Sequence, residues 1–146
     1  MTARDYDLRI MKMEDYDTVY ALWRNTPGIS LGAADSREQI EAFLLRHPGF
    51  SFVAEVQGEI VGALLAAHDM RRGFLYHLAV KPEQRKKGIA QALVERCLMR
   101  LKDTGIAKVH VFVFRDNAEG MRFWQGSGWK QREDIHVFSH SIVSGE

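Results

Sequence analysis

The sequence has little that would suit a secreted or membrane-spanning protein. Among its 146 residues there is one cysteine, Cys97, so no disulfide can form within the chain and a disulfide-stapled fold is excluded. No apolar run approaches the ~20 residues that cross a bilayer, and the charged start MTARDYDLRI lacks the apolar stretch of a secretory signal. These absences predict a soluble, cytoplasmic protein that does not bind a membrane, with Cys97 as a small core residue.

An excess of charge of one sign is missing too. Twenty Lys and Arg residues face nineteen Asp and Glu residues, which gives a net charge of +1. Nucleic-acid-binding domains usually carry a basic excess on one face, so nucleic acid is not expected as a partner. The histidines show no metal-ligand spacing, and no metal is expected. The length fits a single domain over residues 1–146.

The hydrophobic pattern predicts helices that alternate with strands. Helices are expected over 16–24, 37–47 and 89–105 and within 117–128. We expect Asp15 to cap the first helix, and Asp35 or Ser36 to cap the second. Strands are expected over 6–11, 50–56, 60–69, 74–80 and 108–114, followed by one or two more between Trp129 and Val143.

The order of these elements predicts the fold class. A strand over 74–80, a helix and a strand over 108–114 form a βαβ unit, which requires parallel strands. Short turns join the other strands, so those neighbours should be antiparallel. The run over 60–69 is almost continuously apolar, which is typical of a central strand covered on both faces. We therefore predict an α/β (α+β) domain: a mixed sheet with antiparallel central strands, one parallel βαβ unit and about four flanking helices.

Residues 78–90, LAVKPEQRKKGIA, concentrate positive charge where a strand ends and a helix begins. A helix N-terminus offers unpaired N–H groups, and Gly88 lets the backbone approach an anion without a Cβ in the way. The pattern suits a phosphate or a pyrophosphate. It lacks the Gly-Lys-Ser/Thr ending of a Walker loop and the repeated glycines of a dinucleotide fingerprint. Taken alone, it fits a solvated, charged turn equally well.

A second pattern downstream supports the anion site. Arg85, Gly88 and Ala90 match the signature Arg/Gln-x-x-Gly-x-Gly/Ala, and NAEGMRFWQGSGW (117–129) matches an Asn…Phe-Tyr…Gly-Phe pattern. Both occur in the GNAT superfamily of acyl-CoA-dependent N-acetyltransferases. The sequence resembles this family over nearly its whole length, with the two motifs in the expected order and spacing.

The resemblance implies acetyl-CoA as cosubstrate. In GNAT proteins the backbone at the end of the strand before the signature pairs with the pantetheine arm, and the following loop holds the pyrophosphate. An Asn after the next strand often touches the cofactor as well, although it would also serve as a helix cap. The implied cofactor-binding residues are Leu78, Ala79, Val80, Arg85, Lys86, Lys87, Gly88, Ile89, Ala90 and Asn117.

The implied reaction is direct attack of a primary amine, on a small molecule or a peptide, on the acetyl thioester. Trp124 stands where the family often has a Tyr that protonates the leaving thiolate, and an indole cannot do so. Tyr76 is the candidate catalytic residue, because it is the only polar side chain on its strand face, with a core tyrosine as the alternative. Strand alternation places His77 on the opposite face, in a packing role.

Two other functions remain open at the level of the sequence. A non-catalytic acyl-CoA-binding or interaction module with the same fold is favoured by Trp124, and a nucleic-acid binder fits the balanced charge poorly. The acceptor side is expected to comprise loop 25–36, the first two helices and the C-terminal strands. These segments contain no acidic cluster that would select a polyamine or an aminoglycoside, and a homodimer is compatible with the sequence.

Overall fold

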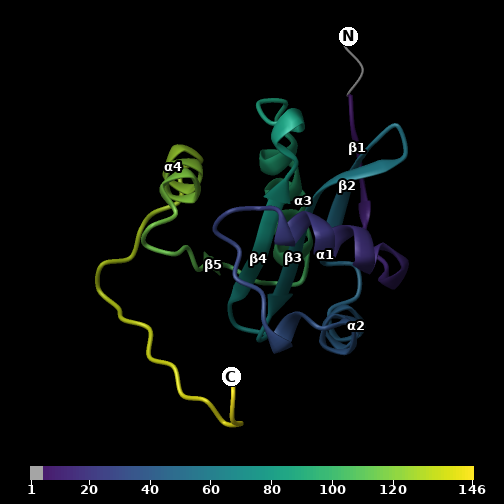
Figure 1. Cartoon of the computed structure of the whole chain (residues 1–146). Helices are drawn as coiled ribbons and strands as arrows, with labels where there is room; N and C mark the ends of the chain where they lie inside the picture. Colours follow the sequence, from purple (N-terminus) through teal and green to yellow (C-terminus); the bar gives the residue numbers. More distant parts are fainter. Residues whose placement is uncertain (1–4) are drawn as a thin grey trace.

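A five-stranded mixed sheet forms the centre of the protein in a computed structural model that describes residues 5–146 (Figure 1). The strands follow one another across the sheet in sequence order, antiparallel from first to fourth and parallel between fourth and fifth. This confirms the predicted mixed sheet with one βαβ unit. The strands are β1 (Asp7–Ile10), β2 (Phe52–Val56), β3 (Glu59–His68), β4 (Gly73–Val80) and β5 (Val109–Val111).

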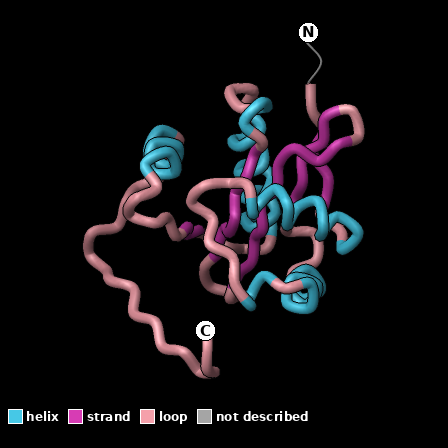
Figure 2. The backbone as a smooth tube through the Cα atoms, in the orientation of Figure 1, coloured by secondary structure: helices cyan, strands magenta, loops and turns pink. Residues whose placement is uncertain are grey.

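Helices cover both faces of this sheet, as Figure 2 shows. The helix α3 packs on one face, while α1 and α2 pack on the other. The fourth helix, α4, stands near the β5 edge (Figure 1). No helix among residues 5–146 is long and apolar enough to cross a membrane. The helices are α1 (Tyr16–Arg24), α2 (Arg37–Arg46), α3 (Ile89–Asp103) and α4 (Ala118–Gly126).

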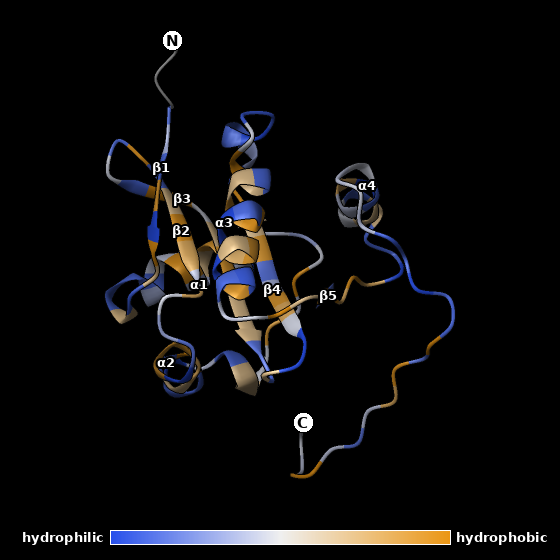
Figure 3. Ribbon diagram, turned by 180° about the vertical axis from the view of Figure 1, so that it is seen from behind, coloured by the Kyte–Doolittle hydropathy of each residue, from blue (hydrophilic) through white to orange (hydrophobic). Residues whose placement is uncertain are grey.

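The central strand β3 divides the core into two clusters, as its sequence predicts. Leu64 and Ala66 face α3, whereas Ala63 and Leu65 face α1, and all four are buried. Figure 3, coloured by hydropathy, shows the apolar strands behind the amphipathic α3. Burial of apolar side chains contributes roughly 25 cal/mol per Å², so a strand buried on both faces is a main source of stability.

Cys97 lies in the cluster under α3, with no exposed surface, which confirms its predicted core position. Its Sγ donates a hydrogen bond to the carbonyl oxygen of Phe50 at 3.3 Å. Burial raises the pKa of the thiol to about 12. The thiolate is the reactive form, so Cys97 is inert in the folded protein.

We expect maleimide to label Cys97 at least about a thousandfold more slowly in the folded protein than in denaturant, since at pH 8 a thiol with a pKa of about 12 is almost wholly protonated. Mass spectrometry of timed samples measures both rates. Similar rates in the two states would show that the α3 face opens readily.

Three predicted local features are wrong. Asp15 does not cap α1 through its side chain; its carboxylate accepts hydrogen bonds from the N–H of Lys12 and from Nη1 and Nη2 of Arg9. The fifth strand covers 109–111 rather than 108–114, because only Gly73–Leu75 pairs with it. Residues 130–143 form no strand at all. The expectation that the N-terminus lacks a secretory signal falls partly on residues 1–4, which lie outside the described residues.

A β-bulge in β4 reverses the direction that simple strand alternation predicts for the side chain of His77. Leu65 pairs with Tyr76 and Ala63 with Ala79, so Leu64 alone stands opposite two residues of β4. Within this bulge, His77 has a φ of 58°, the left-handed region that His adopts more readily than most residues. The extra residue turns His77 toward α1, on the side of the sheet that also carries Tyr76. The predicted opposite face is therefore wrong.

Candidate functional site

The C-terminal half of β4 presents an edge without a partner strand. Its pairing with β5 stops at Leu75, whereas its pairing with β3 continues to Val80. Beyond Leu75, the backbone groups on the β5 side of β4 therefore meet no described strand. Such an edge can pair with an extended ligand. Leu78, Ala79 and Val80, the residues predicted to hold pantetheine, all lie on this stretch, and their side chains pack inward against the two core clusters.

The same edge leads directly to an uncapped helix N-terminus. After β4, a short turn and a loop carry the chain to α3, whose first residue is Ile89. No side chain caps this helix, and the N–H groups of residues 86–90 make no hydrogen bond to any described residue. Free N–H groups and the positive end of the helix dipole favour an anion at this position.

Two left-handed residues fold this loop. Lys86 has a φ of 64° and Gly88 a φ of 82°. Left-handed residues turn successive N–H groups toward one side and so form a concave anion site. A Cβ added to Gly88 would meet no atom within 4 Å. The space in front of the backbone is thus open, which fits a phosphate group at this place.

The cations of the loop have different surroundings. Arg85 forms an ion pair with Glu119 in the first turn of α4, which links the loop to that helix. Lys87 donates a hydrogen bond to Gln84 at 2.9 Å, while Lys86 is exposed. Ile89 buries its side chain in the core and Ala90 packs beside it, so these two residues can offer a ligand their backbone only.

Asn117 caps α4, the alternative role that the sequence left open. Its Oδ1 accepts the N–H of Gly120 at 3.0 Å. Its amide also lies against Gly28, since a Cβ there would come within 2.3 Å of Asn117 Nδ2. This contact joins the loop between α1 and α2, on the predicted acceptor side, to the start of α4.

Trp124 packs within an aromatic group. Its ring lies 4.7 Å from that of Trp129 and 5.0 Å from that of Phe123, between centroids. These contacts give the indole a packing role at the root of the C-terminal segment.

Tyr76 lies half-buried in a row of aromatic rings on the α1 side of the sheet. Its ring stacks on Phe74 at 6.3 Å and meets Phe43 edge-on at 6.2 Å. Burial raises the pKa of the phenol above its ordinary value. The group is therefore neutral at physiological pH, able to donate a proton but unsuited to accept one.

His77 belongs to a hydrogen-bonded pair that sequence reasoning missed. Its Nε2 lies 2.7 Å from Oδ1 of Asp35, a buried residue just before α2. The other carboxylate oxygen of Asp35 accepts the N–H of Gly32, and its backbone carbonyl accepts the hydroxyl of Tyr16. The ring also packs edge-on against Trp23 at 5.0 Å. Both members of the pair are held in place from several sides.

This arrangement fixes the tautomer of His77. A carboxylate accepts hydrogen bonds, so Nε2 carries the proton and Nδ1 is the basic nitrogen. Nδ1 makes no hydrogen bond to a residue of the described chain. The result is an imidazole oriented by a carboxylate, which can take up a proton at Nδ1.

Asp35 was predicted as one of two candidate caps for α2. Ser36 takes that role, with its Oγ accepting the N–H of Gln39, and Asp35 is thereby free to bind His77. One signal in the sequence could have suggested the pair: two adjacent cap-type residues before one helix, of which only one can act as the cap.

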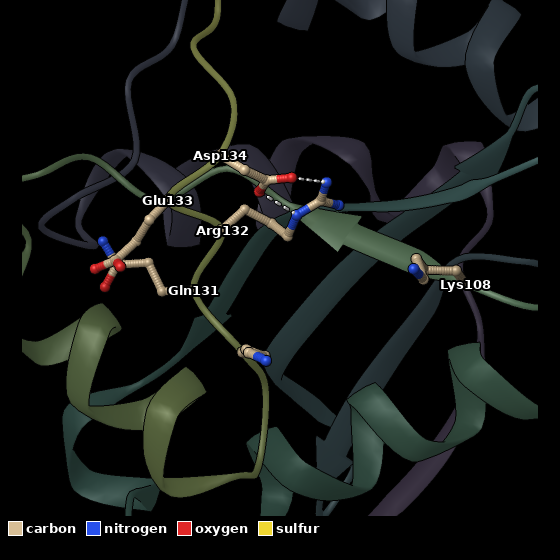
Figure 4. Close-up of a pocket in the computed structure, with 6 residues that line it drawn as sticks. Lys108, Gln131, Arg132, Glu133 and Asp134 are labelled. Atoms are coloured by element: carbon tan, nitrogen blue, oxygen red, sulfur yellow. Dashed lines mark hydrogen bonds and ion pairs between the residues drawn. The ribbon is translucent and has the colours of Figure 1, made fainter.

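A shallow hollow on the surface holds none of these residues. Figure 4 shows Lys108 on one side and residues 130–134 on the other, with Arg132 and Asp134 joined by two hydrogen bonds. Its lining is charged and exposed, and it lies beside the start of β5. Within residues 5–146 no group of His, Cys, Asp and Glu residues is arranged to hold a metal ion.

Comparison with known proteins identifies the family. The model of the acetyltransferase (GNAT) family matches residues 16–129, well over half of the chain. The chain belongs to the GNAT acetyltransferase family. An acetyltransferase of Photorhabdus laumondii is 36% identical over 138 residues, covering 94% of this chain and 96% of that protein. An acetyltransferase of Pectobacterium atrosepticum is 37% identical over 111 residues, covering 76% and 78%.

Solved structures confirm the GNAT fold. The PaiA N-acetyltransferase of Thermoplasma acidophilum, in complex with coenzyme A, superposes with a TM-score of 0.79 at 20% identity, covering 89% of this chain and 92% of that one. The aminoglycoside acetyltransferase AAC(6')-Iy, bound to a bisubstrate analogue, superposes with a TM-score of 0.74 at 18% identity, covering 94% and 99%. At these identities the similarity establishes the fold of this GNAT protein, and its substrates require their own argument.

Proposed function

We propose that this GNAT protein transfers an acetyl group from acetyl-CoA to a primary amine of a small molecule or a peptide. The observation that carries the proposal is the unpaired edge of β4 leading into the N-terminus of α3, which follows Gly88 and has no side-chain cap. An extended arm with amide groups suits the edge, and a pyrophosphate suits the helix N-terminus. Membership of the family supports acetyl-CoA as the donor.

Backbone groups and charged side chains would both contribute to the binding of acetyl-CoA. The backbone of Leu78–Val80 would pair with the pantetheine arm, and the N–H groups of residues 86–90 would hold the pyrophosphate. Lys86 and Lys87 add positive charge beside these amides. Asn117 caps α4, whose Glu119 pairs with Arg85 of the loop. Bound there, acetyl-CoA supplies an acetyl group activated as a thioester, with a thiolate as leaving group.

His77 is proposed as the proton acceptor for the amine. An amine attacks only in its neutral form, so its proton must be removed before or during attack. The Nδ1 of His77 is basic, and Asp35 stabilises the imidazolium that forms when the ring takes up the proton. His77 directly precedes Leu78, so the proton acceptor would lie next to the proposed pantetheine edge. The acceptor amine would approach from the α1 side of the sheet, where His77 and Tyr76 both lie.

Tyr76 remains the proposed proton donor. A phenol is protonated at neutral pH, so Tyr76 can donate a proton to the departing thiolate. Burial raises its pKa, which makes it a weaker acid. Trp124 cannot supply that proton. A thiolate of this kind also leaves unassisted, so the contribution of Tyr76 should be smaller than that of His77.

The test of the function is a screen for acetyl acceptors that covers amino acids, polyamines, aminoglycosides and peptide N-termini. Release of free CoA thiol and the mass of the acetylated product are recorded together. We expect release that depends on at least one amine, with a product heavier by one acetyl group. Binding of acetyl-CoA without any amine-dependent release across the panel would support the alternative, a non-catalytic acyl-CoA-binding module, which Trp124 favours.

For an acceptor found in this screen, Tyr76→Phe should lower kcat about tenfold, below the ~10²–10⁴-fold of a full general acid, and leave the Kd for acetyl-CoA nearly unchanged. Stopped-flow measurement of thiol release gives the rate. As the matched comparison, Trp124→Phe should change kcat little and Trp124→Tyr should keep or raise it. Loss of activity in a folded Trp124→Phe variant, with Tyr76→Phe fully active, would place the thioester elsewhere.

We propose that the protein works in the cytoplasm. The buried thiol of Cys97 and the absence of a disulfide support this, since both suit a reducing compartment. The partners proposed are acetyl-CoA and the acceptor amine, without nucleic acid or membrane, and the near-neutral net charge of +1 supports that choice.

A further inference from the structure

Four aromatic rings lie in a row across the sheet, and we call them the aromatic row. Phe74 of β4 lies 6.3 Å from Tyr76 and 6.2 Å from Phe112, between ring centroids. Each of these two pairs has an interplanar angle of only 17°. Tyr76 in turn meets Phe43 of α2 at 6.2 Å. Side chains from one helix and two neighbouring segments of the sheet thus form a continuous aromatic surface.

The aromatic row lies on the α1 side of the sheet over its whole length. In β5, Val109 and Val111 pack against the core cluster under α3. His110, between them, lies 5.9 Å from the ring of Phe74 instead. Because side chains alternate along a strand, Phe112 projects to the same side as His110. The row therefore occupies the face from which the acceptor amine is proposed to approach.

The outer end of the aromatic row is open to solvent. Phe112 exposes 62% of its surface, and Phe74 and Tyr76 are partly exposed. The helix α1 packs on β3 and β4, and Figures 1 and 3 both show β5 at the edge of the sheet away from α1 and α2. Neighbouring apolar side chains left exposed in this way mark a binding surface.

The inner end of the aromatic row reaches the residues proposed to move protons. Tyr76 belongs to the row, and His77 follows it directly, turned to the same side by the β-bulge. A ligand whose amine lies at Nδ1 of His77 would therefore have the rings beside it for the rest of its body. This step rests on the proposed function, which supplies the amine.

The surroundings of the row favour an acceptor with a single amino group. Asp35 is the carboxylate beside His77, and its two oxygens already bind His77 and the N–H of Gly32. A second ammonium group on the ligand would lose hydration over the rings, and attraction to the ring faces would repay only part of that loss. An uncharged aromatic group instead gains from burial and from ring–ring contacts.

We propose that the acceptor is an aromatic monoamine, a primary amine joined to a flat aromatic ring that carries no second charge. The ring of the acceptor packs on Phe74 and Phe112, and the amine lies at His77. Phe74 and Phe112 thereby set the specificity for the acceptor without taking part in proton transfer.

The first test compares two acceptors of equal length, 2-phenylethylamine and its saturated counterpart 2-cyclohexylethylamine, with putrescine as the dication. In the wild type we expect kcat/KM to favour the aromatic amine about fivefold over the saturated one and at least about tenfold over putrescine. A ratio near one for the first pair, or faster acetylation of putrescine, would overturn the proposal.

The second test changes the rings of the protein. Phe74→Leu and Phe112→Leu should each lower the ratio of kcat/KM for the aromatic over the saturated amine about threefold. This ratio does not depend on the folded fraction of a variant. Phe114→Leu is the control, since Phe114 is also exposed, at 55%, but its ring pairs with no ring of the row among the described residues. An equal fall in all three variants would contradict the assignment.

A third measurement needs no turnover and so separates this proposal from the proposed function. 2-Phenylethylamine is titrated by calorimetry into protein saturated with CoA, and Phe74→Leu should weaken its binding about fivefold. Acetylation of other amines without this binding would overturn the proposal and leave the acetyltransferase function intact. Binding without acetylation of any amine would overturn the function and keep the aromatic-amine site. If Phe112→Leu altered only the sedimentation of the protein, the row would be a contact between two copies and the proposal would be wrong.

Discussion

His77→Gln should lower kcat/KM for amine acetylation by about 10³-fold, within the ~10²–10⁴-fold that a positioned general base contributes. The glutamine amide can still donate to Asp35 from near the position of Nε2, but it offers no basic nitrogen at neutral pH. The backbone at this position has a φ of 58°, and Gln57 shows that glutamine adopts a φ of 51° in this protein. The change therefore removes the proton acceptor and keeps the site's shape.

The result is read together with two controls. The Kd for acetyl-CoA, measured by calorimetry, should stay within about threefold of wild type, because the proposed pantetheine contacts use the backbone of the residues that follow. Asp35→Asn should lower the rate less than His77→Gln, since the imidazole remains. A His77→Gln variant that is folded, binds acetyl-CoA and acetylates at the wild-type rate would remove His77 from the mechanism.

Gly88→Val should weaken acetyl-CoA binding about a hundredfold. The valine side chain would project into the open space in front of the loop, where the phosphate would meet the backbone. Loss of one or two charge-assisted hydrogen bonds, at ~1.5–3 kcal/mol each, accounts for a factor of this size. Titration calorimetry with CoA and with a pantetheine fragment lacking the pyrophosphate measures the effect, which should be confined to CoA.

The left-handed φ of 82° makes Gly88→Val costly for folding as well, so the control must carry the same strain. Gly58, in the β2–β3 turn, has a φ of 79° and equally open surroundings. Gly58→Val should destabilise the protein by a similar amount in thermal unfolding and bind CoA normally. Equal loss of CoA binding in both variants would attribute the effect to strain, and normal binding by Gly88→Val would contradict the proposed phosphate site.

The features that sequence reasoning predicted are local or periodic. The glycine before α3 and the two-sided burial of β3 follow from residues close together in the chain, and the parallel β4–β5 pair follows from the order strand, helix, strand. The Asp35–His77 pair could not be predicted in this way. Its members stand 42 residues apart, and their contact depends on a β-bulge that the sequence GFLYHLAV does not indicate. Alternation along a regular strand gave the wrong face for His77.

The prediction of C-terminal strands was wrong for a different reason. Residues 134–143 include β-branched and aromatic side chains that favour a strand, but a strand also needs a neighbouring strand to pair with, and composition does not supply one. The end of β5 shows the same dependence, since residues 112–114 continue a strand-like sequence without a partner. The residues there do favour a strand, but without a partner strand to pair with they do not form one.

Titration of the wild-type protein with acetyl-CoA in a calorimeter tests the central claim most directly, because it needs no knowledge of the acceptor amine. The unpaired β4 edge, the free N–H groups of residues 86–90 and the cations beside them predict one binding site per chain, with a Kd in the micromolar range typical of a working cosubstrate. Desulfo-CoA should compete for it. A folded protein that gives no binding heat with either acetyl-CoA or CoA, at two temperatures, would contradict the proposed site and the function built on it.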